Sequence, residues 1–176
     1  MYLEHRKKLI KGQLRQASLV FLEAEDRVLL AMKKRGFGQG RWNGSGGKML
    51  PGETITQTAR REVKEELGVK LKNLHHVATL DFYFPLVATA RGLDQQVIVF
   101  LSDTWDGKIC ETAEMKPRWF RKNKLPLARM WSDDRFWVPA IFRGKFVKAE
   151  FALGKDDTVL EKKVLVYEAP SKEITS

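Results

Sequence analysis

The sequence lacks the residues that would cross-link it or carry it across a membrane. Cys110 is the single cysteine among 176 residues, which excludes an internal disulfide and agrees with a reducing compartment. No apolar run approaches the roughly 18 residues that a membrane-spanning helix needs. The N-terminal stretch 1–16 is basic but has no apolar middle of the kind found in secretory signals. We therefore expect a cytoplasmic protein, with a mitochondrial or nuclear fraction as the alternative.

Acidic residues are also scarce relative to basic ones. The chain has 32 Lys and Arg against 22 Asp and Glu, a formal net charge of +10. Such a surplus favours polyanionic partners, and charge alone does not separate nucleic acid from nucleotide phosphates. With 43% hydrophobic residues the chain suits one domain. We expect a solvated basic arm over 1–16, a single domain over 17–168 and a tail over 169–176.

Periodicity and turn residues predict an α+β fold with a mixed β-sheet covered by helices. A glycine-rich connection over 35–53 is too dense in glycine to form a helix. The sequence around Pro139 predicts a late helix with a stop or kink. The expected strands are 17–23, 27–33, 75–85, 95–103, 117–120, 145–153 and 158–167, and the expected helices are 55–67 and 135–143.

The helix expected over 55–67 has the most informative pattern. Thr54 and Gln57 fit a capping box, and Gly68 fits the position just past the helix end. At about 100° per residue Glu62, Glu65 and Glu66 share one face of this helix, beside its apolar stripe. Like charges at this spacing repel, and a hard divalent cation bound by carboxylate oxygens would relieve the repulsion. The alternative is a solvated acidic face, with Arg61 paired to Glu65.

The same residues carry a resemblance to a known family. The pattern G-x5-E-x7-R-E-U-x-E-E-x-G-U, in which U is aliphatic, is the Nudix box, and this chain is identified as a member of the Nudix hydrolases by a match at every fixed position. The matching residues are Gly47, Glu53, Arg61, Glu62, Val63, Glu65, Glu66, Gly68 and Val69.

The resemblance implies the Nudix fold, a mixed sheet between helices (α/β/α) with the box as a loop–helix–loop. It implies hydrolysis of a nucleoside diphosphate linked to another group, with Mg²⁺ as cofactor and Mn²⁺ as a substitute. The implied catalytic residues and metal ligands are Glu62, Glu65 and Glu66, joined at the metal by the Gly46 carbonyl and Glu114. Glu53 and Arg61 would hold the loop and the helix in place.

The flanks of the box resemble one branch of the family, the hydrolases of oxidised purine nucleoside triphosphates. The matching stretches are Met32–Lys48, Ala113–Phe120 and Met130–Pro139, and the similarity runs from about Ser18 to Tyr167. The implied substrates are of the 8-oxo-dGTP and 2-hydroxy-dATP type, cleaved to monophosphate and pyrophosphate. The implied binding residues are Ser18, Lys33, Phe37, Asn43, Ser45, Gly47, Lys48, Phe82, Phe84, Met115, Trp131, Asp133 and Asp134.

These implied roles have a physical basis. Trp131 would stack on the purine, and Asn43 offers a donor and an acceptor to its edge. Asp133 and Asp134 would share one proton, because two adjacent carboxyls in a closed site do not both ionise. Alternatively, Asp133 and Asp134 are ordinary acidic residues at a helix N-terminus, and the aromatic residues belong to the apolar core. The chain departs from the branch at Ser45 and Ser132, where an aromatic residue and a proline are expected.

The expected partner is therefore a small nucleotide, with no membrane and no stable nucleic-acid partner, and the protein is expected to be a monomer. Two other functions stay open. One is another Nudix specificity, for general (d)NTPs, diadenosine polyphosphates or capped RNA. The other is a nucleotide- or RNA-binding module without catalysis, which the complete set of box glutamates disfavours.

Overall fold

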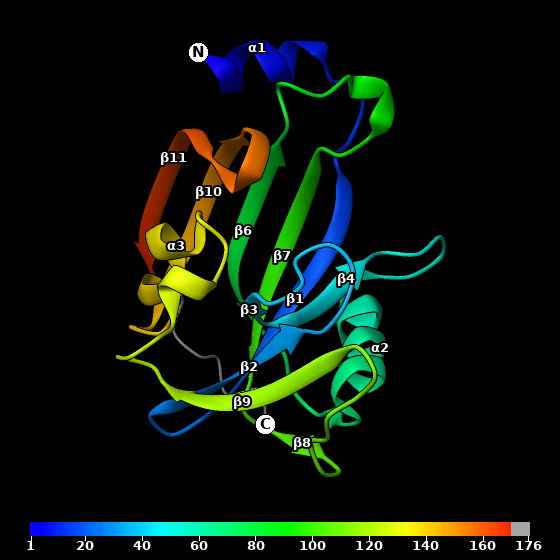
Figure 1. Ribbon diagram of the computed structural model, residues 1–176, viewed down its shortest axis with the longest axis vertical. Helices are drawn as coiled ribbons and strands as arrows, with labels where there is room; N and C mark the ends of the chain where they lie inside the picture. Colours follow the sequence, from blue (N-terminus) through cyan, green and yellow to red (C-terminus); the bar gives the residue numbers. More distant parts are fainter. Residues whose placement is uncertain (170–176) are drawn as a thin grey trace.

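The computed structural model describes residues 1–169, so all but the first residue of the tail expected over 169–176 lies outside the described residues (Figure 1). The helices are α1 (Tyr2–Leu9), α2 (Ile55–Leu67) and α3 (Asp134–Ile141). The strands are β1 (Arg15–Ala24), β2 (Arg27–Lys33), β3 (Trp42–Asn43), β4 (Ser45–Lys48), β5 (Lys70–Leu71), β6 (His75–Tyr83), β7 (Gln95–Ser102), β8 (Trp105–Asp106), β9 (Met115–Arg121), β10 (Lys145–Leu153) and β11 (Val159–Glu168).

One mixed sheet organises the molecule. Its strands follow the order β11-β10-β6-β7-β1-β2-β3, with β4 paired to β1 and β9 paired to β2. The pairs β1–β7 and β6–β10 are parallel, and the other pairs of this sheet are antiparallel. The mixed sheet and the closing hairpin β10–β11 are as the sequence predicted, whereas the two-stranded sheet β5–β8 was missed.

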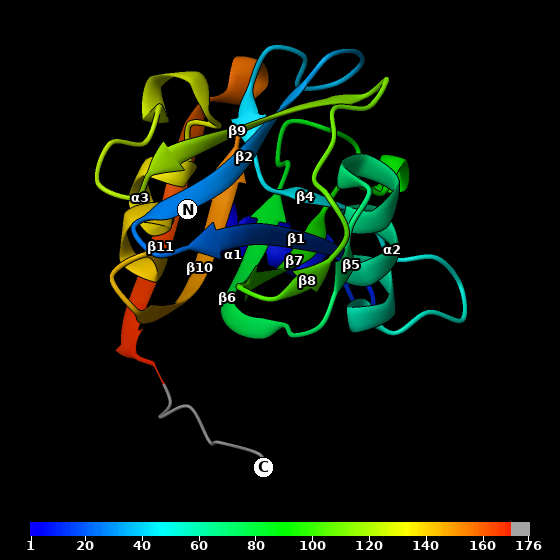
Figure 2. The same ribbon diagram turned by 90° about the horizontal axis from the view of Figure 1, so that it is seen from below.

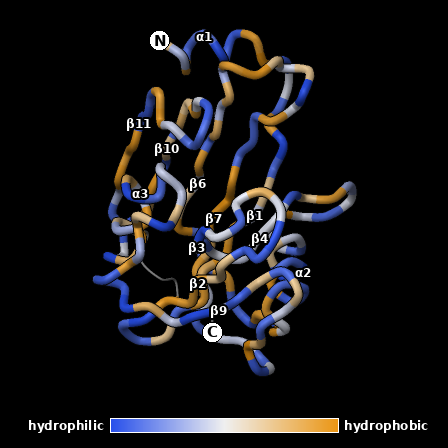
Figure 3. The backbone as a smooth tube through the Cα atoms, viewed as in Figure 1, coloured by the Kyte–Doolittle hydropathy of each residue, from blue (hydrophilic) through white to orange (hydrophobic). Residues whose placement is uncertain are grey.

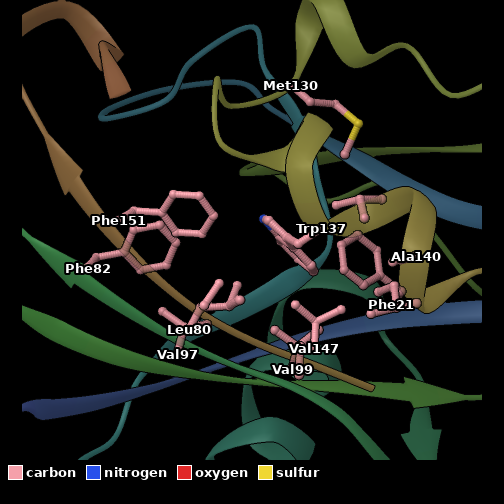
Figure 4. Close-up of a cluster of buried hydrophobic side chains, with 14 of the residues drawn as sticks. Phe21, Leu80, Phe82, Val97, Val99, Met130, Trp137, Ala140, Val147 and Phe151 are labelled. Atoms are coloured by element: carbon pink, nitrogen blue, oxygen red, sulfur yellow. The ribbon is translucent and has the colours of Figure 1, made fainter. Parts of the chain in front are cut away.

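The sheet lies between helices, as the α/β/α prediction required. Phe21 and Leu30 belong to the apolar core under α3, whereas their chain neighbours Leu22 and Leu29 belong to the core under α2. Because successive side chains of a strand point to opposite faces, the two helices cover opposite sides of the sheet (Figure 2). The hydrophobic stretch of β7 runs through the middle of the molecule in Figure 3. The core beneath α3 includes Trp137, as Figure 4 shows.

Helix α2 begins and ends where the sequence predicted. The side chain of Thr54 accepts a hydrogen bond from the Gln57 amide, and the Gln57 side chain accepts one from the Thr54 amide. Gly68 follows the helix at φ 79°, in the left-handed region that glycine adopts without steric cost. These two caps fix the register of the helix and therefore the direction of its glutamates.

The glycine-rich connection 35–53 forms no helix, as expected, but it contains the short strands β3 and β4, which pair with β2 and β1. The expectation for the N-terminal arm needs correction. The basic arm is not a solvated segment, because residues 2–9 form α1 and bury Leu3 and Arg6. The sequence suggested a solvated arm because an arginine lies on the buried face of α1, and Arg is rarely buried unless it is paired. No helix of the described residues is long and apolar enough to cross a membrane.

Candidate active site

Arg61 pairs with carboxylates on and beside the acidic face of α2. Its guanidinium donates to Glu53 at 2.7 and 3.1 Å, to Glu62 at 2.6 Å and to Glu65 at 3.4 Å. The expected Arg61–Glu65 pair is therefore present, but it is the longest of these contacts. The hydrogen bond from Arg61 also lowers the pKa of Glu53 to about 2. Glu53 precedes the helix, so Arg61 ties the loop before α2 to the helix itself.

Glu66 is held differently from the other two box glutamates. Its carboxylate is buried and accepts hydrogen bonds from the Ser45 hydroxyl at 2.6 Å and the Gly46 amide at 3.1 Å. Burial raises its pKa to about 7, while the Ser45 hydrogen bond and the charge of Lys33 act in the opposite direction. Ser45, one of the two departures from the family branch, thus orients a carboxylate of the box.

The glycines of β4 let the helix approach the sheet. A Cβ atom on Gly47 would lie 2.5 Å from the Glu62 carboxylate, a distance that real Cβ atoms do not reach. Gly47 pairs in register with Ser18 of β1. The Ser18 hydroxyl is buried without a hydrogen-bond partner in residues 1–169. Because buried polar groups are nearly always paired, this hydroxyl is an exception beside the box.

The oxygen donors of this region fit a hard divalent cation. Glu62 and Glu66 converge on the backbone of Gly46 and Gly47, which supplies carbonyl oxygen of the kind that Mg²⁺ and Mn²⁺ accept. Within the described part of the chain, no three acidic, His or Cys side chains already form a closed ligand set. Glu65 is 60% exposed at its side chain. Glu114 forms an ion pair with Arg35 at 3.0 Å and does not form such a ligand set with Glu62 and Glu66.

A second group of residues surrounds Trp131. The Phe37 ring stacks on Trp131 with the ring centroids 5.1 Å apart, although Phe37 itself is 82% exposed. The Arg41 guanidinium lies 4.5 Å from the Trp131 ring and donates to the Met130 carbonyl at 2.9 Å. The indole is therefore held in a fixed plane, with part of its surface exposed.

Asp133 and Asp134 are both buried at the start of α3. Asp133 accepts a hydrogen bond from the Trp137 indole at 3.0 Å, and Asp134 accepts one from the Trp131 amide at 2.9 Å. Burial raises the pKa of Asp133 to about 6. Burial, and next the Asp133 carboxyl, raise the pKa of Asp134 well above its ordinary value. The interpretation of these acids as simple helix N-terminal charges does not account for their burial.

Sequence reasoning missed two charged residues of this group. Asp157 forms an ion pair with Arg41 at 3.1 Å, and it accepts hydrogen bonds from the Ser132 amide at 2.9 Å and hydroxyl at 3.2 Å. Asp157 has φ 62°, which Asp tolerates better than most residues. The sequence showed Asp157 only as a turn residue. Arg41 lies within Met32–Lys48, a stretch that resembles the family branch. That resemblance was the sequence signal that could have identified it.

The remaining expected binding residues lie in separate places. Phe82 is buried and stacks on Phe151 with centroids 5.6 Å apart, and Phe84 packs at the border of the same core (Figure 4). The Asn43 side-chain oxygen accepts a hydrogen bond from the Gly44 amide at 2.8 Å. Met115 belongs to the core under α2, on the other side of the sheet from Phe82. Of the expected phosphate-binding lysines, Lys33 is half-buried at the end of β2 and Lys48 is exposed at the end of β4.

Comparison with known proteins identifies a matching family and similar sequences. The family model of the NUDIX domain matches residues 13–141. The oxidized purine nucleoside triphosphate hydrolase of Danio rerio is 41% identical over 147 residues, which cover 84% of this chain and 92% of that protein. The protein of the same name from Mus musculus is 42% identical over 81% of this chain and 89% of its own length.

A more distant curated relative and a solved structure complete the comparison. The NAD-capped RNA hydrolase NudC of Klebsiella pneumoniae is 30% identical over 72% of this chain, which covers 47% of that protein. The crystal structure of a MutT protein from Bacillus halodurans aligns with a TM-score of 0.74 and 23% identity, over 86% of this chain and 97% of that one. This structural match supports the arrangement of sheet and helices.

Proposed function

Because the chain belongs to the Nudix hydrolase family, we propose that it hydrolyses oxidised purine nucleoside triphosphates to the monophosphate and pyrophosphate. The observation that carries this proposal is the buried pair Asp133 and Asp134 beside Trp131, which offers a proton-sharing hydrogen-bond edge next to an aromatic plane. Relatives named for this activity are 41% and 42% identical to the chain. The activity would remove damaged nucleotides from the pool before polymerases use them.

In this proposal the carboxylates of α2 hold the divalent cation. Glu62, Glu65 and Glu66 would supply hard oxygen ligands, with the Gly46 carbonyl as a further ligand, and Glu114 would complete the set on leaving its ion pair with Arg35. The cation, when bound, neutralises the phosphate chain and lowers the pKa of an attacking water. One of the three α2 glutamates assists that water as a base.

The phosphates and the base occupy different parts of the site. Lys33 and Lys48 screen the phosphate charge, and Gly47 lets the Glu62 carboxylate lie directly against the backbone of β4. Trp131 stacks on the purine. The residues proposed to contact the base or the sugar are Ser18, Phe37, Asn43, Phe82, Phe84, Asp133 and Asp134. The expected contacts from Ser45 and Met115 are not part of this proposal, because Ser45 binds Glu66 and Met115 lies on the other side of the sheet from Phe82.

The loop that packs on Trp131 offers a direct test of the stacking role. Gly38 has φ +84°, and a Cβ atom there would lie 2.8 Å from Trp131 Cζ2. We expect Gly38→Ala to displace the indole and raise KM for 8-oxo-dGTP by about 5-fold, equivalent to about 1 kcal/mol of lost binding.

The matched control for Gly38→Ala is Gly36→Ala. Gly36 has a similar φ of +76° but open space around its Cβ position. Both variants should lose about 1–2 kcal/mol of stability from the left-handed backbone, measured by urea unfolding. A rise in KM of equal size in both variants would show that backbone strain, and not the contact with Trp131, is responsible.

The function itself is tested by a substrate panel with Mg²⁺ and with Mn²⁺. The panel contains 8-oxo-dGTP, 2-hydroxy-dATP, their unoxidised counterparts, a diadenosine polyphosphate and NAD-capped RNA. We expect kcat/KM for 8-oxo-dGTP to exceed that for dGTP by more than about 10-fold, because buried hydrogen-bonding groups reject a mismatched edge. A ratio near one would favour another Nudix specificity, and no hydrolysis of any member would favour a binding module.

A further inference from the structure

A buried ion pair joins the N-terminal helix to the strand end that follows the β6–β7 loop. The Arg6 guanidinium of α1 binds the Asp94 carboxylate through Nε at 3.0 Å and through an Nη atom at 2.7 Å. The two side chains are 3% and 7% exposed. A buried pair of this kind adds little net stability, because desolvation offsets most of the attraction. Its main effect is to fix the position of whatever it holds.

The pair holds both ends of the loop between β6 and β7. Arg6 also donates to the Val87 carbonyl at 2.7 Å, and Asp94 accepts a hydrogen bond from the Phe84 amide at 2.9 Å. Val87 and Asp94 of the segment 84–94 therefore contact the Arg6 guanidinium directly, and Phe84 is joined to it through the Asp94 carboxylate. In Figure 1 this loop, in green, and α1, in blue, lie together at one end of the sheet.

Apolar contacts fix α1 but contribute little to the loop. Leu3 packs with Tyr83 of β6 and Ala152 of β10, which anchors the helix on the sheet. The loop itself is mostly exposed. Between residues 9–15 and 89–94 lies a hollow of about 420 Å³. Close packing therefore does not hold this part of the loop; polar contacts do, namely the buried Arg6–Asp94 pair and an exposed hydrogen bond from Arg15 to the Gly92 carbonyl at 3.1 Å.

The loop begins at a residue that borders the proposed purine site. Phe84 packs on the same apolar core as Phe82, two positions earlier on β6. A shift of the Phe84 backbone would move this aromatic ring relative to the base, while leaving α2 and its glutamates in place. Helix α1 lies outside the residues 13–141 that match the family model. Helix α1 thus supports a wall of the site from outside the matched residues.

We propose that α1 is a positioning element, in which Arg6 positions the Phe84 loop through Asp94 and so sets the affinity for the purine. Arg6 is a positioning residue that does not touch the nucleotide. The proposal rests on the proposed function, since it assigns Phe84 to the purine site.

The test compares Arg6→Met and Arg6→Lys with the control Lys8→Met in the full chain. Lys8 is exposed on the same helix, so the control removes the same charge without touching the loop. Arg6→Met leaves Asp94 buried without a cation and can destabilise the fold. Arg6→Lys keeps the cation but loses the two-pronged geometry, so it carries the test if Arg6→Met does not fold.

Two measurements are made on each variant that melts as one cooperative unit. We expect amide hydrogen exchange over residues 84–94 to accelerate by more than about 10-fold in the Arg6 variants, because the local opening energy falls. We expect KM for 8-oxo-dGTP to rise about 5-fold with kcat within about 2-fold, the signature of lost binding in ground and transition states alike. The Lys8 control should match the wild type in both.

The outcomes separate this proposal from the proposed function. Unchanged exchange in the loop, or faster exchange with unchanged KM, would overturn the positioning role. A parallel loss of kcat would point to general damage and would also overturn it. If the wild type does not prefer 8-oxo-dGTP over dGTP, the proposed function fails, whereas the exchange result still reports whether Arg6 holds the loop.

Discussion

Glu66→Gln is expected to lower the turnover of 8-oxo-dGTP by more than about 100-fold, beyond the loss that outer-shell changes at metal sites usually cause. The same variant should bind the nucleotide base with affinity close to that of the wild type. The two effects separate because Glu66 lies at the proposed cation site on α2, whereas Asp133, Asp134 and Trp131 lie around the start of α3.

The geometry around Glu66 makes this a test of charge and not of folding. A single carboxylate oxygen, Oε2, accepts the hydrogen bonds from Ser45 and from Gly46. The amide oxygen of Gln can accept the same two bonds. Burial already raises the pKa of Glu66 to about 7, so a neutral side chain fits its surroundings at least as well. The variant should therefore keep the melting temperature of the wild type.

Turnover is measured from pyrophosphate release, and binding from the quenching of tryptophan fluorescence by 8-oxo-dGMP. The matched control is Glu25→Gln, the same chemical change at an exposed site in the β1–β2 turn. Retention of more than one-tenth of the wild-type rate, as an order-of-magnitude limit, would remove Glu66 from the metal site.

Asp134→Asn is expected to give the second large effect, a loss of about 10- to 100-fold in kcat/KM for 8-oxo-dGTP. The estimate follows from the roughly 1–3 kcal/mol that an unmatched buried hydrogen-bonding group costs. Asn keeps the acceptor for the Trp131 amide, which Asp134 now binds at 2.9 Å. It can donate from its other atom but cannot ionise, so the proton can no longer be placed on either acid of the pair.

Stability should change in the opposite direction to activity. The folded-state pKa of Asp134 lies above its unfolded value, so the native protein binds more protons between those two pKa values. Stability from this group is therefore present at low pH and is lost as pH rises toward the folded pKa. Asn carries no such penalty, so Asp134→Asn should melt higher than the wild type at pH 7.5 and similarly at pH 4.

The wild type should also lose affinity for 8-oxo-dGTP as pH falls through about 6, where Asp133 takes up its proton and the pair no longer contains an ionised acid. The experiment measures kcat/KM for 8-oxo-dGTP and dGTP, with melting temperatures, in the wild type, Asp134→Asn and the exposed control Asp26→Asn. If Asp134→Asn keeps the wild-type selectivity, the acid pair does not read the base. A lower melting temperature at pH 7.5 would contradict the pKa argument.

Much of the fold could be predicted because local signals agreed with the tertiary structure. The capping box and Gly68 fixed both ends of α2 within the chain itself. The glycine-rich segment was harder, since β3 and β4 form only through pairing with β2 and β1. Helix α1 was missed because one of its buried residues is Arg6, and the partner that allows this burial, Asp94, lies far along the chain. No residue near Arg6 in the sequence indicates the pair.

The candidate site divides in the same way. The position of the three α2 glutamates on one face of the helix follows from helical spacing, so their closeness could be predicted. The role of Arg61 in binding three carboxylates depends on how the preceding loop folds back. Asp157 could not be found from spacing, because a turn between β10 and β11 brings it to Arg41. Long-range ion pairs of this type leave no periodic pattern in a sequence.

The parallel pairing of β1 with β7 has a consequence for how the chain reaches this structure. Gln16 of β1 meets Gln96 of β7, 80 positions later, at the centre of the sheet. Such distant pairings slow folding, because a long loop must close before the contacts form. A ribosome would release β1 and β2 as a hairpin well before β7 emerges. The central seam, and with it the complete site, is therefore expected to assemble only late in synthesis.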